Sequence, residues 1–167
     1  EDYLATLDAY FDCTAGVVLE HGGEVLKFIG DGVLAIFPVD TETRRVESMC
    51  RSAISTAREA LERAARMNTK REGSNMPPIK FGMSLHVGEV VYGNVGTDRR
   101  LDFTVIGSAV NEAARLEGLT KNLDVPVVAS AKFADAAPET LVTLGAHKVP
   151  GVSGELEAFT LPELTAS

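Results

Sequence analysis

Apolar residues recur along the first half of the chain at helical and then at strand spacing. In residues 2–20 they return every three to four positions, which predicts an amphipathic helix that ends at "HGG", 21–23. Residues 25–28 and 33–37 then predict two strands joined by "GDG", a strong signal for a tight hairpin. A second helical stripe predicts a long helix over 44–67.

The second half of the chain predicts shorter elements. Residues 68–78 are expected to form a polar loop, and extended stretches at 79–96 and 99–107 follow it around a glycine-rich turn. Ser108 is the expected N-cap of a helix over 109–121. A short strand, a short helix and a final hairpin complete the pattern.

This order of helices and mostly antiparallel strands is typical of an α+β fold, a ferredoxin-like α/β sandwich. We expect one domain over residues 1–167, with its N-terminal strand missing from this chain. With that strand restored, the order becomes β-α-β-β-α-β with additions. Nucleotide enzymes, RNA-binding modules and small metal binders share this fold, so the fold does not select a function.

Composition narrows the classes of partner. The net charge of −8 argues against nucleic acid and against an anionic membrane surface, and so against an RNA-binding module. No run of about eighteen apolar residues is present, so we expect no insertion of this domain into a membrane. Cys13 and Cys50 lie in apolar helical patterns, which favours buried free thiols over a redox or metal role.

Two charges stand among apolar positions of the first predicted hairpin. Lys27 lies on the first strand and Asp31 lies in the turn, four residues later. Because a strand alternates its faces, Lys27 is expected to share a side with Val25 and Ile29. Taken alone, the pair is explained by an Asp-Gly turn and by a lysine whose stem lies along its apolar neighbours.

A second polar pair lies on the predicted helix after residue 108. Asn111 and Arg115 are four apart and therefore share one face. An amide beside a guanidinium can hold a ribose and a phosphate together, although an ordinary polar helix face has the same pattern. The glycines at 88, 93 and 96 allow sharp bends or a close approach of backbone.

Three stretches in this order, "GGEVLKFIGDGVLAIF", "LHVGEVVYGNVG" and "LDFTVIGSAVNEAARLE", resemble the catalytic domain of class III nucleotidyl cyclases. The resemblance covers nearly all of residues 1–161. It implies a domain that pairs head to tail as a homodimer, with active sites shared between the two protomers. It also implies a cytoplasmic adenylate cyclase that converts ATP to 3′,5′-cyclic AMP and pyrophosphate with two divalent cations, Mg²⁺ or Mn²⁺.

The resemblance assigns a role to five residues. Asp31 corresponds to a carboxylate that binds both metals, and Asn111 to the residue that orients the ribose. Arg115 corresponds to the arginine that stabilises the phosphate in the transition state. Lys27 and Thr104 correspond to the pair that reads the base, and Lys27 and Asp31 of one chain are expected to serve different sites.

The base-reading pair also has a chemical argument. A lysine ammonium only donates and a threonine hydroxyl can accept, so the pair suits N1 and N6 of adenine. Guanine would set its N1–H against a pure donor, at a cost of about 1–3 kcal/mol. Thr104 resembles the subset of these cyclases that responds to bicarbonate, and Asp102 is the alternative residue for its role.

The chain departs from the family pattern at several positions. The other metal-binding aspartate is expected upstream of Glu1. Pro150 stands where the family often has a cation for the terminal phosphates, and Lys148 lies two residues earlier. His86 is expected to be a packing residue within a strand and not a general base. Two alternatives therefore stay open, a catalytically inactive cyclase-like regulatory or dimerisation domain and a guanylate cyclase.

Overall fold

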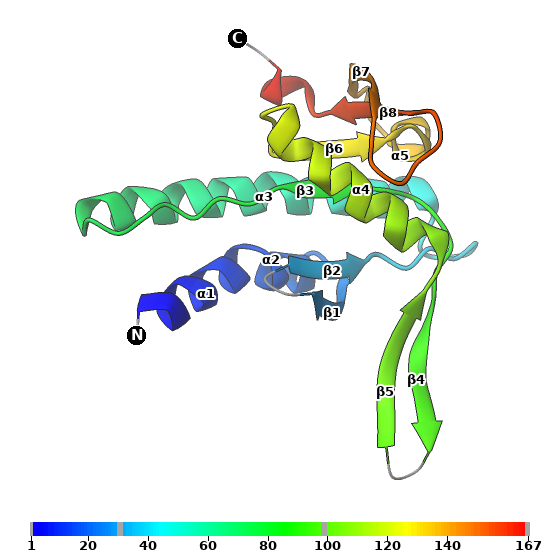
Figure 1. Ribbon diagram of the computed structural model, residues 1–167, viewed down its shortest axis with the longest axis horizontal. Helices are drawn as coiled ribbons and strands as arrows, with labels where there is room; N and C mark the ends of the chain where they lie inside the picture. The colour runs from blue at the N-terminus through cyan, green and yellow to red at the C-terminus, as the bar shows by residue number, and fades with distance from the viewer. Residues whose placement is uncertain (1, 30–31, 98–99, 166–167) are drawn as a thin grey trace. The chain divides into compact units, whose positions relative to one another are not determined.

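The chain divides into two units, Glu1–Phe81 and Gly82–Ser167. The computed structural model describes residues 2–29, 32–97 and 100–165, and of residues 2, 29 and 100–104 it describes only the backbone (Figure 1). No helix among these residues is long and apolar enough to cross a membrane.

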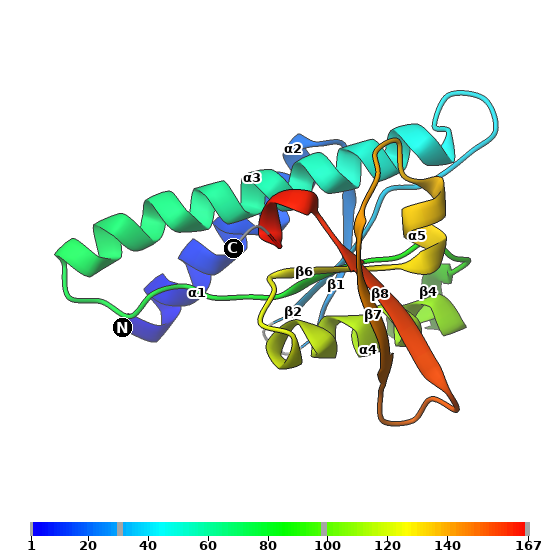
Figure 2. The same cartoon turned by 90° about the horizontal axis from the view of Figure 1, so that it is seen from above.

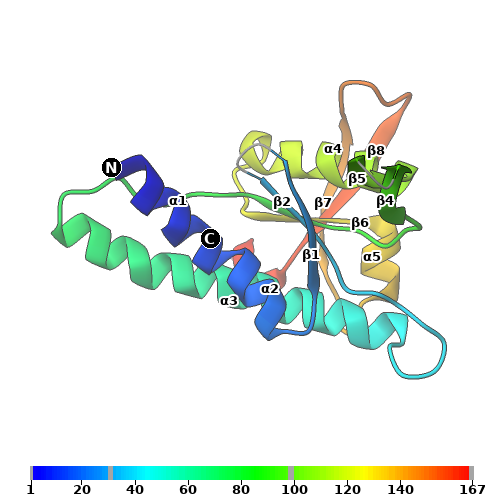
Figure 3. The ribbon, with the colours of Figure 1, turned by 90° about the horizontal axis from the view of Figure 1, so that it is seen from below.

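The first unit packs three helices and a hairpin. Its elements are α1 (Asp2–Cys13), α2 (Ala15–Glu20), β1 (Glu24–Ile29), β2 (Gly32–Ile36) and α3 (Val46–Gly73). Both short helices contact α3, as the view of Figure 3 shows. Cys13, Val17 and Ile54 are at most 2% exposed and form part of the core of this unit. The predicted helix over 2–20 is thus confirmed, with a break at Thr14.

The predicted hairpin is confirmed, but one detail of its register is wrong. β1 pairs antiparallel with β2, and Val25 lies opposite Ala35 while Lys27 lies opposite Leu34. The extra residue on β1 is a β-bulge, which interrupts the alternation of faces. Since neighbouring residues of β2 point to opposite faces, Val25 and Lys27 do not share a side as the strand pattern predicts.

The long helix ends later than predicted. α3 continues to Gly73, so residues 68–73 are helical and not part of the polar loop expected over 68–78. Two side chains of this last stretch bind the segment that follows the helix. The Asn68 amide both donates to the backbone oxygen of Ile79 and accepts from its N–H, at 2.9 and 2.6 Å. The Arg71 guanidinium donates to the backbone oxygen of Pro77 at 2.7 Å.

The second unit is built on a four-stranded sheet in the order β3-β6-β8-β7. These strands are β3 (Met83–Leu85), β6 (Val127–Ser130), β7 (Val142–Lys148) and β8 (Glu155–Thr160), and only the β3–β6 pair is parallel. Helix α4 (Ser108–Asn122) packs on β3 and β6, and α5 (Ala131–Ala136) packs on β6 and β8 (Figure 2). The chain closes with the 3₁₀ turn Pro162–Leu164.

Two further strands form a separate antiparallel pair, β4 (Val91–Thr97) and β5 (Arg100–Ile106). The short strand, short helix and final hairpin predicted for the second half are all present. The prediction for Ser108 is wrong, because α4 begins at Ser108 and its N-cap is Gly107, which has no side chain to cap with. Gly107 has φ +151°, and a Cβ there would lie 2.7 Å from the backbone oxygen of Glu89. Only glycine fits this approach.

Candidate functional site

The hairpin residues of the predicted site belong to the first unit. Lys27 lies on β1 with an exposed side chain, paired across the ladder with Leu34. The residue is therefore accessible to a ligand. Asp31 lies outside the described residues, so its metal-binding role stays a prediction.

The second base-reading residue lies on β5. Thr104 is paired with Gly93 of β4, and the alternative residue, Asp102, is paired with Val95. The two are two residues apart on one strand. Because only the backbone is described here, the choice between them remains a prediction.

Helix α4 brings the predicted ribose and phosphate residues together in the second unit. Asn111 is exposed and Arg115, one turn later, is half-buried. The guanidinium of Arg115 reaches the loop between β7 and β8, where a Cβ added to Gly151 would lie 3.5 Å from one of its terminal nitrogens. No carboxylate of the described residues forms an ion pair with Arg115. The shared helix face predicted from the spacing is confirmed.

The loop that Arg115 touches borders a hollow of about 530 Å³. Six residues of the stretch "KVPGVSG" line it: Lys148, Val149, Pro150, Gly151, Val152 and Gly154. Lys148 is therefore part of the same surface as the loop beside Arg115, although Pro150 occupies the position where the family often has a cation. Two cations near one open hollow suit an anionic ligand such as a phosphate chain.

The contacts of His86 come from residues distant in the sequence, so the sequence did not predict them. His86 follows the end of β3 and is not inside a strand as expected, and its side chain is 5% exposed, as expected of a packing residue. Its Nε2 lies 2.7 Å from a carboxylate oxygen of Glu112 on α4, and its Nδ1 lies 2.8 Å from Oγ of Ser130. Burial lowers the pKa of His86 from its ordinary 6.5, and the nearby Glu112 carboxylate offsets part of this shift.

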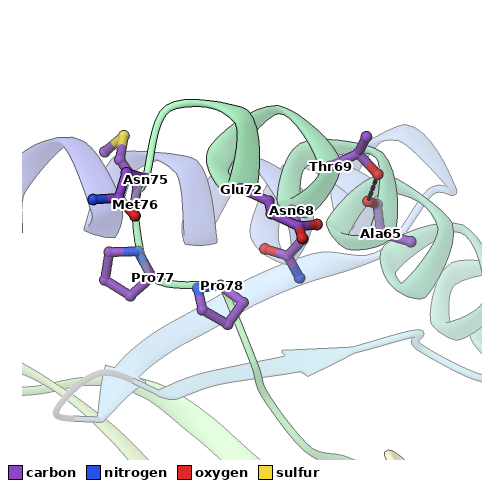
Figure 4. A pocket seen from close by; sticks show the side chains of 8 residues that line it. All are labelled: Ala65, Asn68, Thr69, Glu72, Asn75, Met76, Pro77 and Pro78. Carbon is purple, nitrogen blue, oxygen red and sulfur yellow. Dashed lines mark hydrogen bonds between the residues drawn. The ribbon is translucent and has the colours of Figure 1, made fainter.

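The first unit has a hollow of its own, which no sequence motif indicates. It measures about 530 Å³ and is lined by Ala65, Asn68, Thr69, Glu72, Asn75, Met76, Pro77 and Pro78 (Figure 4). The hydroxyl of Thr69 is occupied by a hydrogen bond to the backbone oxygen of Ala65, drawn dashed in the figure. Asn68 is engaged with Ile79, so the polar groups of this hollow largely serve the helix end.

The described residues form no metal cage by themselves. Within residues 2–29, 32–97 and 100–165, no three His, Cys, Asp or Glu side chains gather as a cation site would require. The two thiols are free and buried, as predicted. Burial raises the pKa of the Cys50 thiol to about 11, and it also raises the pKa of Cys13, so neither thiol is activated.

Known proteins are similar to this chain over nearly its whole length. A family model described as the adenylate and guanylate cyclase catalytic domain matches residues 1–162. Adenylate cyclase 1 of Rhizobium meliloti (strain 1021) is 34% identical over 163 residues, covering 95% of this chain and 24% of that protein. The chain spans about a quarter of the length of the first curated relatives it matches.

Solved structures of cyclases have a similar fold. A bacterial light-regulated adenylyl cyclase has a TM-score of 0.77 and 32% identity, covering 96% of this chain and 45% of that one. The guanylyl cyclase Cya2 has a TM-score of 0.77 and 25% identity, covering 97% of this chain and 82% of that one. The predicted α+β, ferredoxin-like fold with mostly antiparallel strands is confirmed.

Proposed function

This chain belongs to the family of adenylate and guanylate cyclase catalytic domains, and on that basis we propose that it converts ATP to 3′,5′-cyclic AMP and pyrophosphate. Residues 1–167 belong to one catalytic domain in this proposal, and its N-terminal strand is expected to be missing from this chain. The observation that carries it is the arrangement on α4, where Asn111 and Arg115 share a face and Arg115, without a carboxylate partner, reaches the loop at Gly151 that borders the hollow.

The reaction needs a ribose and a triphosphate held in one geometry. The 3′-oxygen of the ribose attacks the α-phosphorus, a new P–O bond forms, and the bond to the departing pyrophosphate breaks. The amide of Asn111 orients the ribose, and the Arg115 guanidinium offsets negative charge that develops on the α-phosphate oxygens. Such electrostatic and positioning work is most of what phosphoryl transfer requires of a protein.

Asp31 is the proposed carboxylate ligand for two divalent cations, Mg²⁺ or Mn²⁺. When bound, these cations supply charge neutralisation at the phosphates and acidify the ribose 3′-hydroxyl. Lys148 is a basic side chain that lines the hollow, and the loop bordering this hollow contacts Arg115.

The proposed working unit is a homodimer in which each protomer contributes to both active sites. Lys27, Thr104, Asn111 and Arg115 of one protomer act with Asp31 of the other. We further propose that the domain works in the cytoplasm and, from Thr104 in the base-reading position, that bicarbonate activates it.

Selectivity for ATP over GTP rests on Lys27 and Thr104 in this proposal. The test is kcat/KM for both nucleotides in wild type, Lys27→Glu and Thr104→Ala. Lys27→Glu removes the donor to adenine N1 and supplies an acceptor for guanine N1–H. We therefore expect the ATP:GTP ratio to fall at least about tenfold, since the substitution removes one contact with ATP and adds one with GTP, each worth about 1–3 kcal/mol. Thr104→Ala should change the ratio less, because a hydroxyl both donates and accepts.

A matched control is Lys80→Glu, which makes the same charge change at another exposed lysine of the first unit. It should leave the ATP:GTP ratio unchanged. A wild type that prefers GTP would replace the proposal by guanylate cyclase activity. A wild type that binds ATP but forms no cyclic nucleotide would favour the inactive regulatory domain.

A further inference from the structure

The side chain of His86 lies at a junction of three elements in the second unit. It follows β3, its Nε2 contacts Glu112 on α4 at 2.7 Å, and its Nδ1 contacts Ser130 at the start of α5 at 2.8 Å. The side chain is only 5% exposed, whereas that of Glu112 is 38% exposed. The ring is thus fixed from both sides, and it holds a carboxylate that is itself partly exposed to water.

The partners of the ring favour one assignment of its proton. Oγ of Ser130 accepts the backbone N–H of Phe133 at 3.1 Å, as the N-cap of α5, so its own proton is available for Nδ1 of His86. Nε2 then carries the hydrogen and donates it to Glu112. Burial lowers the pKa of His86, and Lys132 adds to that shift while Glu112 opposes it, which favours this neutral tautomer.

A glycine of the motif "LHVGEVV" makes this junction possible. A Cβ on Gly88 would lie 2.6 Å from Cβ of Ala109 on α4 and 3.3 Å from Nε2 of His86. The first distance is too short for any side chain, so only glycine lets the segment after β3 approach α4 this closely. The motif therefore serves to bring His86 to Glu112.

Glu112 has a second possible partner on its own helix. Arg115 lies three residues later, a spacing at which a carboxylate and a guanidinium commonly pair. No such pair is present among the described residues, because the Glu112 carboxylate is bound to His86 and the Arg115 guanidinium reaches Gly151. Glu112 is thus held by His86, which the proposed reaction does not use, and not by Arg115.

We propose that His86 is a positioning residue that keeps the Glu112 carboxylate away from Arg115, so that the guanidinium stays available to the substrate phosphate. This inference rests on the proposed function, because it assigns a purpose to the availability of Arg115. Without the bond to His86, Glu112 pairs with Arg115 and competes with the phosphate. The carboxylate also adds negative charge where the transition state accumulates it.

The variants separate a hydrogen bond from simple packing. His86→Asn removes the donor at the Nε2 position, and His86→Gln keeps a donor near it. Glu112→Gln removes the competing charge, alone and combined with His86→Asn. We expect His86→Asn to lower kcat about tenfold with KM for ATP changed less than about twofold, since Arg115 acts mainly in the transition state. His86→Gln should keep most of the activity.

The double variant is the decisive comparison. Removing the Glu112 charge should return kcat of the His86→Asn protein to within about threefold of the Glu112→Gln protein. If His86 merely supports the fold, the double variant will be as impaired as His86→Asn, and the inference is overturned. Retention of full activity by His86→Asn would overturn it as well.

A spectroscopic measurement judges the inference independently of turnover. Nitrogen-15 NMR of the wild type should show His86 as the Nε2–H tautomer. The Arg115 Nε–H resonance should shift from its wild-type position in His86→Asn and go back toward that position in the double variant. An unmoved Arg115 resonance overturns the inference whatever the activity. If the wild type makes no cyclic nucleotide but the variants show these shifts, the proposed function is refuted and the contact between Glu112 and Arg115 is supported.

Discussion

Asp40 shows how one exposed side chain can organise a stretch of backbone. One of its carboxylate oxygens accepts the N–H groups of Glu42, Thr43 and Arg44 at 2.8, 2.7 and 3.0 Å. These backbone hydrogen bonds lower the pKa of Asp40 from 3.8 to about 2. The N-cap of α3 is Arg45, whose side chain makes no capping hydrogen bond. The hydrogen bonds of the Asp40 carboxylate therefore hold the turn that precedes α3.

The lowered pKa predicts a pH dependence of stability. Since the pKa in the folded chain lies below that in the unfolded chain, Asp40 stabilises the fold fully above about pH 4, and this contribution is lost as the pH falls toward 2. Asp40→Ala should therefore lower the urea midpoint at pH 7, with a difference from wild type that narrows between pH 4 and pH 2. Glu42→Ala, which removes an equal charge within the same loop but leaves the Asp40 carboxylate in place, is the control and should show a smaller difference at pH 7. A difference for Asp40→Ala that stays constant down to pH 2 would contradict the assignment.

Single residues also show what the sequence could and could not predict. Asn111 and Arg115 were predictable because helical spacing alone places them on one face. The side on which Lys27 lies was not, because the bulge at Leu26 depends on pairing with β2. The contacts of His86 were also hidden, because Ser130 lies 44 positions away along the chain.

At the scale of elements, the end of α3 is the main difference between expectation and structure. The apolar stripe fades after Met67, so periodicity predicts an end there, yet the helix continues to Gly73. Arg71 explains the extension. Its side chain is buried and donates to the backbone oxygen of Pro77 at 2.7 Å and to the hydroxyl of Thr6 on α1 at 3.0 Å. A tertiary contact of this kind overrides a local pattern.

Removing Arg71 should therefore destabilise the last turn of α3 and its contact with α1. We expect Arg71→Ala to lower the free energy of unfolding by about 2–4 kcal/mol, because a buried charged donor is removed and two partly buried acceptors lose their partner. The amides of Ser74 and Met76, which bind backbone oxygens of the last helical turn, should exchange faster with deuterium. Lys70→Ala, at the exposed neighbouring position, is the control. Equal effects of the two substitutions on unfolding would show that Arg71 contributes only its charge or its helix propensity.

At the scale of the whole molecule, the α+β class was predictable from element order, and the structure and comparisons confirm it. The site was predictable only through resemblance. Nothing in periodicity or charge assigns Lys27 to the nucleotide base or Arg115 to a phosphate. A lysine whose stem lies along apolar neighbours of a strand and an arginine on a polar helix face are both ordinary. The residues assigned by resemblance are distributed over the two units, Lys27 in the first and Asn111 and Arg115 in the second.

The proposed homodimer predicts that two different inactive variants restore each other. Asp31→Asn and Arg115→Ala should each be nearly inactive alone. In a heterodimer of the two, one active site combines the intact Asp31 of one chain with the intact Arg115 of the other. With random pairing, half of the dimers are mixed and each has one of two sites intact, so the mixture should recover about a quarter of wild-type activity.

The control for this experiment is a mixture of Asn111→Ala and Arg115→Ala. Both residues are proposed to come from the same protomer at each site, so every site in the mixed dimer keeps one lesion and no activity should return. Differently tagged chains and native mass spectrometry establish that subunits have exchanged. Mixed dimers of Asp31→Asn and Arg115→Ala that form in quantity and stay inactive would refute shared sites. Recovery in the control mixture would instead show that Asn111 and Arg115 act from different protomers, and the assignment of residues to each half of the site would have to be revised.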